Sequence, residues 1–249
     1  MKSPLITLIV PVWGGDDALL VDLVNRLPFY PNPIEWIVAA VEPSERLRDL
    51  GRSGEIRLLV CDKPSRGAQM NAGAMEARGS LLCFHHADSE LGPEHLAALA
   101  AVAKTDGIIG GAFHRQFDDR HFWMKRWEGL VRRISMAAGP LFGDQSIFVK
   151  ADVFQQMGGF ADIPLMEDIE FSRRLRRMGR ITLLDPPLWS SPRRFRHLGN
   201  LRTLLLNALF IVLFYFRVSP HTLHRWYYGE RFDRQRHANR RTAECSHPE

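Results

Sequence analysis

The feature that most constrains the fold is a regular alternation of short apolar runs with amphipathic stretches in the first half of the chain. Strands are predicted over Leu5–Val12, Glu35–Val41, Ile56–Cys61 and Leu81–His85. Helices are predicted after Asp16-Asp17, over Gly67–Arg78 and after Pro93. This rhythm predicts an α/β fold, a Rossmann-like mixed and mainly parallel sheet with helices on both faces. Ligands of such sheets bind beyond the carboxyl ends of the strands, so the residues after each strand are the first candidates for a site.

The second half of the chain is less regular. Apolar runs predict further strands over Ile108–Phe113, Ser146–Val149 and Ile181–Leu184. Helical spacing of apolar residues predicts helices over Phe122–Ala138 and Asp168–Met178. Neither an internal repeat nor a low-complexity linker separates these segments, which favours one large domain.

Composition excludes several classes of protein. With 45% hydrophobic and 24% charged residues among 249, the chain is neither a disordered polymer nor a collagen-like or multi-span membrane protein. The run Leu5–Val12 is short, contains Pro11 and leads into an acidic turn, so we expect a buried strand rather than a signal peptide. Three scattered cysteines suit neither a disulfide framework nor a zinc site, and they favour a reducing cytoplasm.

The net charge of +5 comes from arginines concentrated in Arg173–Arg202 and in the tail after Arg217. Such a surface attracts phosphates, anionic lipid or nucleic acid. We do not expect nucleic-acid binding, because the basic segments carry no evident platform of base-stacking aromatic residues.

The most apolar helical segment is Thr203–Phe216, flanked by Arg202 and Arg217. It is shorter than the roughly 20 residues that a bilayer span needs. A helix buried in the core or in a homodimer and a helix lying on a membrane surface both remain open. The expected division is therefore a domain over residues 1–200, followed by an apolar helix and basic tail over 201–249.

Candidate metal ligands follow the strand that ends near His85. Asp88 supplies a carboxylate at the end of a buried strand, where a hard cation such as Mg²⁺ or Mn²⁺ takes oxygen ligands and shares them with substrate phosphates. His86 points the same way along an extended chain and is acceptable to Mn²⁺. The alternative is that Asp88 only caps the helix near Pro93.

Candidate catalytic carboxylates open the helix predicted over Asp168–Met178. Glu167 and Asp168 lie in its first turn, where the helix dipole favours ionised carboxylates. An ionised carboxylate that faces a cleft can take a proton from an attacking hydroxyl group. Ordinary capping of the helix is the alternative.

Two further segments are weaker candidates. Lys63–Gly73 is a Gly-rich turn that opens a helix, where backbone N–H groups and Arg66 could approach a nucleotide diphosphate. Clustered guanidinium groups in Ser190–Arg196 could stabilise a phosphate leaving group. Tight helix packing and a solvated basic face are the respective alternatives.

The order of these segments is more specific than any one of them. Pro11-Val12, Arg66–Gly73, His86-Ala87-Asp88, Glu167-Asp168 and Arg193-Arg194-Phe195 resemble the landmarks of inverting family-2 glycosyltransferases with the GT-A fold. The sequence of these motifs resembles even more closely a bacterial subgroup labelled radical-SAM/selenodomain-associated transferase 2. Further motifs carry this closer resemblance: Gly143-Asp144-Gln145, Gly158-Gly159-Phe160 and Pro164–Phe171.

The resemblance implies a hexosyltransferase that uses a nucleotide-sugar donor, a divalent cation and direct displacement with inversion at the anomeric carbon. It implies Asp168 as the general base with Glu167 beside it, and Asp88 with His86 at the Mg²⁺ or Mn²⁺ site. The donor-binding positions that it implies are Pro11, Val12, Glu42, Arg66, Gln69, Asn71, Ala87 and Arg194. The acceptor is unknown, and a lipid-linked acceptor would suit a cytoplasmic enzyme that is peripheral to the inner face of the cell membrane.

The chain departs from the family pattern after its second strand. Ala40 stands where relatives usually carry an Asp that holds the nucleotide, and Glu42 is the candidate substitute. A non-catalytic partner protein with the same fold is therefore an alternative. A nucleotidyltransferase is a further one, although the turn after the first strand is acidic where those enzymes usually carry a basic, Gly-rich loop.

Overall fold

A computed structural model describes residues 5–13, 20, 24, 34–87, 89, 91–117, 139–190 and 200–229. Its strands are β1 (Ile6–Trp13), β2 (Ile34–Val41), β3 (Arg57–Val60), β4 (Leu81–Phe84), β5 (Ile108–Phe117), β6 (Ile147–Lys150) and β7 (Arg180–Ser190). Its helices are α2 (Glu45–Ser53), α3 (Arg66–Glu76), α4 (Pro93–Ala103), α6 (Ala151–Met157), α7 (Glu167–Met178) and α9 (Asn200–Tyr215). A 3-10 turn, η1 (Gly143–Gln145), precedes β6, and a last helix covers 220–229.

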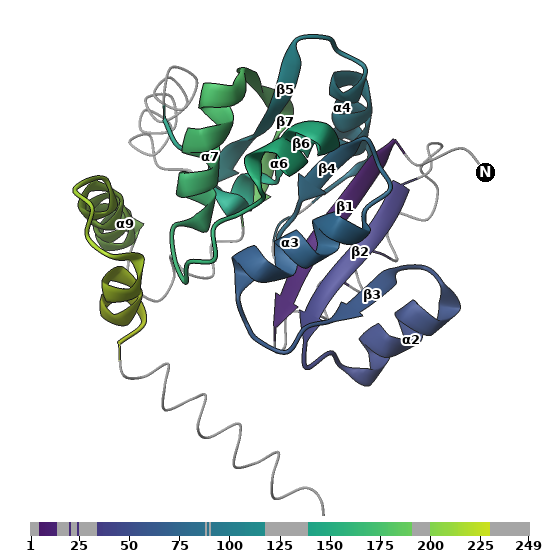
Figure 1. Cartoon of the computed structure of the whole chain (residues 1–249), viewed down its shortest axis with the longest axis horizontal. Helices are drawn as coiled ribbons and strands as arrows, with labels where there is room; N and C mark the ends of the chain where they lie inside the picture. Colours follow the sequence, from purple (N-terminus) through teal and green to yellow (C-terminus); the bar gives the residue numbers. More distant parts are fainter. Residues whose placement is uncertain are drawn as a thin grey trace, which may run out of the picture.

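The strands form one seven-stranded sheet in the order β3-β2-β1-β4-β6-β5-β7 (Figure 1). Only β6 runs antiparallel to its neighbours, β4 and β5. The chain continues from β1 to β2 on one side and reaches β4 on the other, so the strand order reverses at β1. The carboxyl ends of the parallel strands and the beginning of β6 therefore share one edge, which is where such sheets bind ligands.

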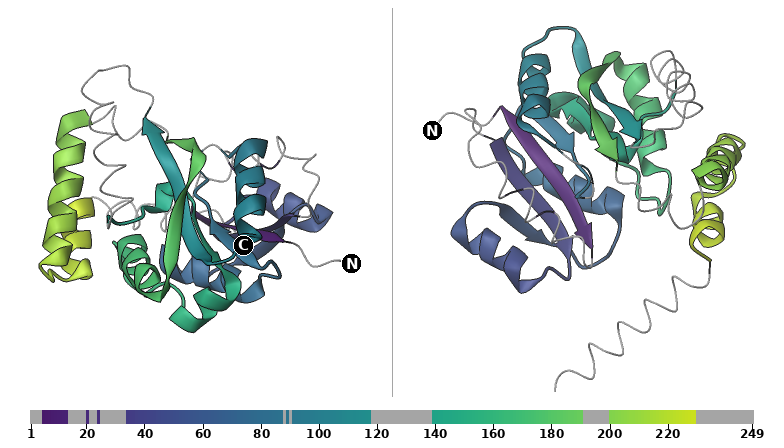
Figure 2. Two further views of the ribbon diagram at one scale, coloured as in Figure 1. Left: turned by 90° about the horizontal axis from the view of Figure 1, so that it is seen from above. Right: turned by 180° about the vertical axis from the view of Figure 1, so that it is seen from behind.

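Helices cover both faces of the sheet, as the alternating pattern predicts. Helix α4 lies on one face, and α3, α6 and α7 lie on the other (Figures 1 and 2). Strand β1 serves both layers, because Leu8 and Val10 enter one apolar cluster while Ile9 enters the second. The second cluster contains Phe160 stacked on Phe171, with ring centroids 4.2 Å apart.

Helix α3 lies close against the sheet because its residues are small. Ser65 caps it by accepting a hydrogen bond from the N–H of Ala68. A Cβ atom on Gly73 would lie 2.5 Å from Cγ2 of Ile9, so only glycine allows this approach of α3 to β1. The close packing brings the start of α3 to the carboxyl ends of β1 and β2.

The sequence predicts all seven strands, although β7 is longer than the expected Ile181–Leu184. Helices α2 and α6 were not predicted. The helix expected over Phe122–Ala138 lies outside the described residues, as does the turn after β1.

Candidate functional site

The predicted site residues divide by position. Most of the predicted site residues lie at or next to the carboxyl edge of the sheet, or at the helix starts that face it. They are Pro11, Val12, Glu42, Arg66, Gln69, His86, Ala87, Glu167 and Asp168. Asp88 and Arg194 lie outside the described residues.

Asp168 is fixed by backbone N–H groups at both carboxylate oxygens. The N–H of Gly143, in η1, donates to Oδ2 at 2.8 Å, and the N–H of Ile169 donates to Oδ1 at 2.7 Å. The side chain of His86 approaches the same glycine, because a Cβ on Gly143 would lie 2.7 Å from His86 Nε2. That imagined Cβ would also lie 3.6 Å from Asp168 Oδ2. Gly143 therefore lies next to both Asp168, the predicted base, and His86, the predicted metal ligand.

The electrostatics of Asp168 suit a group that accepts protons. Burial, and after it the neighbouring charge of Glu167, together raise the pKa of Asp168 to about 7. The hydrogen bonds from Gly143 and Ile169 and the charge of Arg66 oppose this rise in pKa. A carboxyl group with a pKa near neutrality can both take and release a proton under ordinary conditions.

Glu167 is buried beside Asp168 at the start of α7. Nη1 of the exposed Arg66 lies 3.8 Å from its Oε1. Met166, directly before the pair, adopts a left-handed backbone with φ of 68°, which is unfavourable for a side chain of this type. Such local strain is typical of functional sites.

Two predicted donor-binding residues, Gln69 and Asn71, use their side-chain amide groups for hydrogen bonds within the protein. Gln69 donates to the carbonyl oxygens of Val12 at 2.9 Å and Ala39 at 2.7 Å, and so ties the ends of β1 and β2 together. Asn71 donates to the carbonyl of Phe160 at 2.9 Å and accepts from its N–H at 2.8 Å. These contacts shape the edge of the sheet and the loop that leads to α7.

Ala40 and Glu42 differ in how far they are exposed at the end of β2. Ala40 is completely buried in the core, whereas Glu42 is exposed just beyond β2 with a left-handed backbone, φ 53°. Glu42 is thus the accessible carboxylate at this position of the edge. Val12 and Ala87 are buried and Pro11 is partly exposed, which leaves mainly backbone atoms of these residues for any ligand.

Sequence reasoning missed the residues that hold the edge together. Nδ1 of the buried His85 lies 2.7 Å from Oγ of Ser146, and burial lowers the pKa of His85 to about 4, so this histidine is neutral. Gln145 accepts from the N–H of Phe142 and donates to the carbonyl of Phe113. The sequence resemblance includes the motif Gly143-Asp144-Gln145 but implies no role for it.

The proposed metal site draws on the end of β4. Within the described residues there is no group of three or more His, Cys, Asp or Glu side chains arranged to hold an ion. His86 is the predicted ligand that the structure places at the edge. Mg²⁺ and Mn²⁺ commonly take one or two protein ligands and complete their shell with substrate phosphates and water, so Asp88 with His86 is a compatible donor set.

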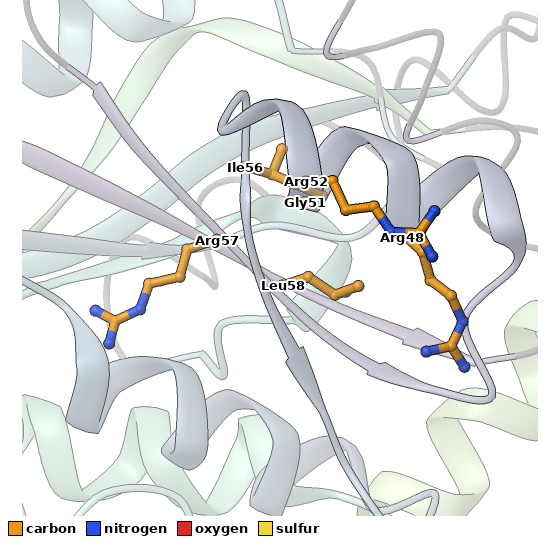
Figure 3. A pocket seen from close by; sticks show the side chains of 6 residues that line it. All are labelled: Arg48, Gly51, Arg52, Ile56, Arg57 and Leu58. Atoms are coloured by element: carbon orange, nitrogen blue, oxygen red, sulfur yellow. The ribbon is translucent and has the colours of Figure 1, made fainter.

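A separate hollow of about 480 Å³ lies between α2 and the beginning of β3 (Figure 3). Its lining residues are Arg48, Gly51, Arg52, Ile56, Arg57 and Leu58. Arg52 pairs with Glu45 and Asp49, and Arg57 pairs with Glu76, so its positive charge is largely compensated. The hollow lies at the opposite end of β3 from the candidate site.

The sheet order and the helices on both of its faces match the GT-A fold. Residues 39–158 match the family described as Glycosyl transferase family 2, a stretch slightly under half of the chain. No curated protein matches the chain significantly in sequence.

Several solved structures share the fold. A mannosyltransferase from Pyrobaculum calidifontis, in complex with GDP-Man and Mn²⁺, has 17% identity and a TM-score of 0.56 over 75% of this chain and 56% of its own. TarS residues 1–349 of S. aureus, with UDP-GlcNAc, have 17% identity and a TM-score of 0.57 over 76% of this chain and 58% of their own. Glucosyl-3-phosphoglycerate synthase from Mycobacterium tuberculosis has 12% identity and a TM-score of 0.54 over 76% of this chain and 72% of its own.

This chain thus spans little more than half of the mannosyltransferase, and it covers only 38% of the chain in another structure of S. aureus TarS. At these identities the likeness shows the fold.

Proposed function

We propose that this protein is an inverting glycosyltransferase that moves a hexosyl group from a nucleotide-diphosphate donor to an acceptor hydroxyl group. The observation that carries the proposal is the carboxylate of Asp168, which accepts from the N–H of Gly143, the same glycine that the ring of His86 approaches. The resemblance to the radical-SAM/selenodomain-associated transferase 2 subgroup belongs to the same proposal.

The donor lies across the carboxyl ends of β1, β2 and β4. Arg66 is exposed at the start of α3, where its guanidinium and the first N–H groups of the helix can meet phosphate oxygens. Glu42 is placed to accept hydrogen bonds from the nucleoside, and Pro11, Val12 and Ala87 present backbone atoms to it. Arg194 stabilises the leaving diphosphate. The structural neighbours that carry GDP-Man, UDP-GlcNAc or UDP support a nucleotide-linked donor.

Asp88 and His86 would hold a Mg²⁺ or Mn²⁺ ion in this proposal. Such an ion, when bound, neutralises charge that develops on the diphosphate. Two of the structural neighbours contain Mn²⁺, which supports a divalent cation without distinguishing Mn²⁺ from Mg²⁺.

Asp168 takes the proton of the acceptor hydroxyl group as that oxygen attacks the anomeric carbon. The N–H groups at Oδ1 and Oδ2 orient the carboxylate and leave its remaining lone pairs for the acceptor. Attack from the side opposite the leaving diphosphate inverts the anomeric configuration. Glu167 keeps the pKa of Asp168 high, which strengthens the base.

A panel of UDP-, GDP- and dTDP-sugars tests the proposal when each is added with Mn²⁺ to the purified protein. We expect at least one donor to raise the melting temperature of the protein. We also expect NMR to show that the first product to form, the glycoside or the released sugar, has the inverted anomeric configuration. A retained configuration would overturn the inverting mechanism, and the failure of every donor would favour the non-catalytic alternative.

The alternative of a non-catalytic partner protein rests on Ala40, which is buried where relatives carry the nucleotide-binding Asp. Glu42 is exposed two residues later, and Asp168 keeps its N–H donors, so an active enzyme is the better account. A nucleotidyltransferase is disfavoured by the acidic turn Gly14–Asp17.

The acceptor is proposed to be lipid-linked, with a cytoplasmic enzyme working at the inner face of a membrane. The catalytic unit is residues 1–200, and residues 201–249 form the accessory segment. A homodimer that buries α9 is the alternative role for that segment.

A further inference from the structure

The last two described helices, α9 and 220–229, pack mainly on each other. They lie to one side of the body, beside α7 and apart from the sheet (Figures 1 and 2). Phe210 and Leu223 are buried, and the ring of Phe210 lies 5.3 Å from that of Tyr227. We call this pair of helices, residues 200–229, the C-terminal hairpin. The interpretation of α9 as a helix buried in the domain core is therefore wrong.

The hairpin exposes a continuous apolar stripe. Leu206, Leu209, Val212 and Phe216 follow one another at intervals of three or four residues, which places them along one side of the helix. Leu209 is 50% exposed and Phe216 is 79% exposed. Exposed apolar residues clustered in this way mark a surface that meets another apolar phase or a partner.

The second helix adds an aromatic side chain of the kind that favours a membrane interface. Trp226 is 61% exposed, and its indole combines an apolar ring with one N–H donor. Trp residues gather at the level of lipid headgroups because one part of the ring prefers hydrocarbon and the other prefers water. Trp226 therefore extends the exposed apolar surface with a side chain suited to the headgroup level.

The charge of the hairpin is of one sign. Residues 200–229 contain Arg202, Arg217 and Arg225 and no Asp or Glu. Arg217 and Arg225 are exposed, one at the end of the apolar stripe and one beside Trp226. Basic residues next to an apolar stripe are attracted to anionic lipid headgroups.

The length of the hairpin excludes one mode of membrane contact. Among the helices of the described residues, none combines the length and the hydropathy that a crossing of the bilayer requires. A helix of this composition and length is suited to lie in the plane of the interface.

We propose that the C-terminal hairpin binds the surface of an anionic lipid bilayer, with Leu209, Val212 and Phe216 inserted and Arg217 and Arg225 on the headgroups. The inference names the surface that would bring the proposed enzyme to a lipid-linked acceptor. It stands on the hairpin alone, so vesicle binding tests it whether or not the protein transfers a sugar.

The experiment sediments the full chain with phosphatidylcholine vesicles, with and without phosphatidylglycerol. We expect binding to the anionic vesicles, at least about tenfold weaker binding to neutral ones, and loss of binding as salt rises from about 0.1 M to about 1 M and shortens the screening length. The double variant Leu209→Ser/Phe216→Ser should bind anionic vesicles at least about tenfold more weakly. The matched control is Val60→Ser/Met75→Ser, which replaces two exposed apolar residues of the body and should bind like the wild type.

A second measurement locates the contact. The emission of Trp226, taken as wild type minus Trp226→Phe, should shift to shorter wavelength when anionic vesicles are added. Equal weak binding to both vesicles, unchanged binding of the Leu209→Ser/Phe216→Ser variant, or binding with no Trp226 shift would each overturn the proposal. A wild-type dimer in solution that this variant converts to a monomer, without vesicle binding, would show that a second copy covers the stripe.

Discussion

At the scale of single residues, opposing influences act on the carboxylate of Asp168, the proposed base. Burial and the charge of Glu167 favour its protonated form, while the N–H groups of Gly143 and Ile169 favour its ionised form. The balance leaves a pKa near neutrality on a side chain that is still partly exposed to an acceptor.

Replacing Asp168 with Asn should lower kcat by about 10² to 10⁴-fold, which is the usual contribution of a positioned general base. Donor affinity, measured by calorimetry with Mn²⁺, should change little. The matched control is Asp152→Asn, because Asp152 also accepts from the next backbone N–H at the start of a helix but lies at the opposite edge of the sheet. Near-normal turnover in the Asp168 variant would remove the base assignment.

The pH dependence of turnover follows from the raised pKa of Asp168. Only the ionised carboxylate accepts a proton, so kcat/KM should rise with pH up to about 7 and level off above it. An ordinary exposed Asp, with a pKa near about 3.9, would give no such rise in this range. A profile that is flat from about pH 5 upward would contradict the environment assigned to Asp168.

At the scale of elements, the site depends on η1 and on the loop before α7. The η1 turn is held by Gln145 and places the Gly143 N–H on Asp168, while Asn71 of α3 pairs with the backbone of Phe160. Arg174 adds hydrogen bonds from α7 to the carbonyls of Met157 and Gly159. Three separate segments are thus fixed by polar contacts to backbone.

Gly143→Ala should reduce activity and stability together, because the new methyl group would meet the ring of His86 within 3 Å. An overpacked site of this kind costs about 1–3 kcal/mol, measurable by urea unfolding. The double variant Gly143→Ala/His86→Ala should regain stability without regaining activity. If the second substitution restored no stability, the contact between Gly143 and His86 would not be the cause.

Asn71→Ala should destabilise the protein by about 1–3 kcal/mol, since it leaves the N–H and carbonyl of Phe160 without their partner. Asn71→Asp keeps the acceptor and should lose less. The KM for the donor should change little in either variant. A stable Asn71→Ala protein with a strongly raised KM would instead support direct donor contact, as the family resemblance implies.

Sequence reasoning succeeded where side chains carry the information. The runs that form β1, β2 and β4 are apolar except for Thr7 in β1 and Glu35 in β2, and the apolar spacing within α7 predicts an amphipathic helix. Helix α2 was missed because it has only two buried positions, Leu47 and Leu50. The hydrogen bond from Gly143 was also missed, because a backbone N–H has no sequence signature and its acceptor lies 25 residues away.

At the scale of the whole molecule, strand order brings distant segments to one edge of the sheet. Strand β6 enters between β4 and β5 in the opposite direction, so η1 precedes it at the same edge where β4 ends. This reversal sets Gly143 beside His86. The C-terminal hairpin lies outside the sheet, which separates the proposed chemistry from the proposed membrane contact.

The central claim is that a nucleotide-sugar donor lies at this edge with Asp168 facing its anomeric carbon. A crystal structure with Mn²⁺ and a donor identified in the panel tests it most directly. The account predicts anomalous scattering from Mn²⁺ at Asp88 and the diphosphate, and Asp168 on the side of the sugar opposite the diphosphate. A nucleotide bound elsewhere, or Asp168 separated from the sugar by protein, would contradict it.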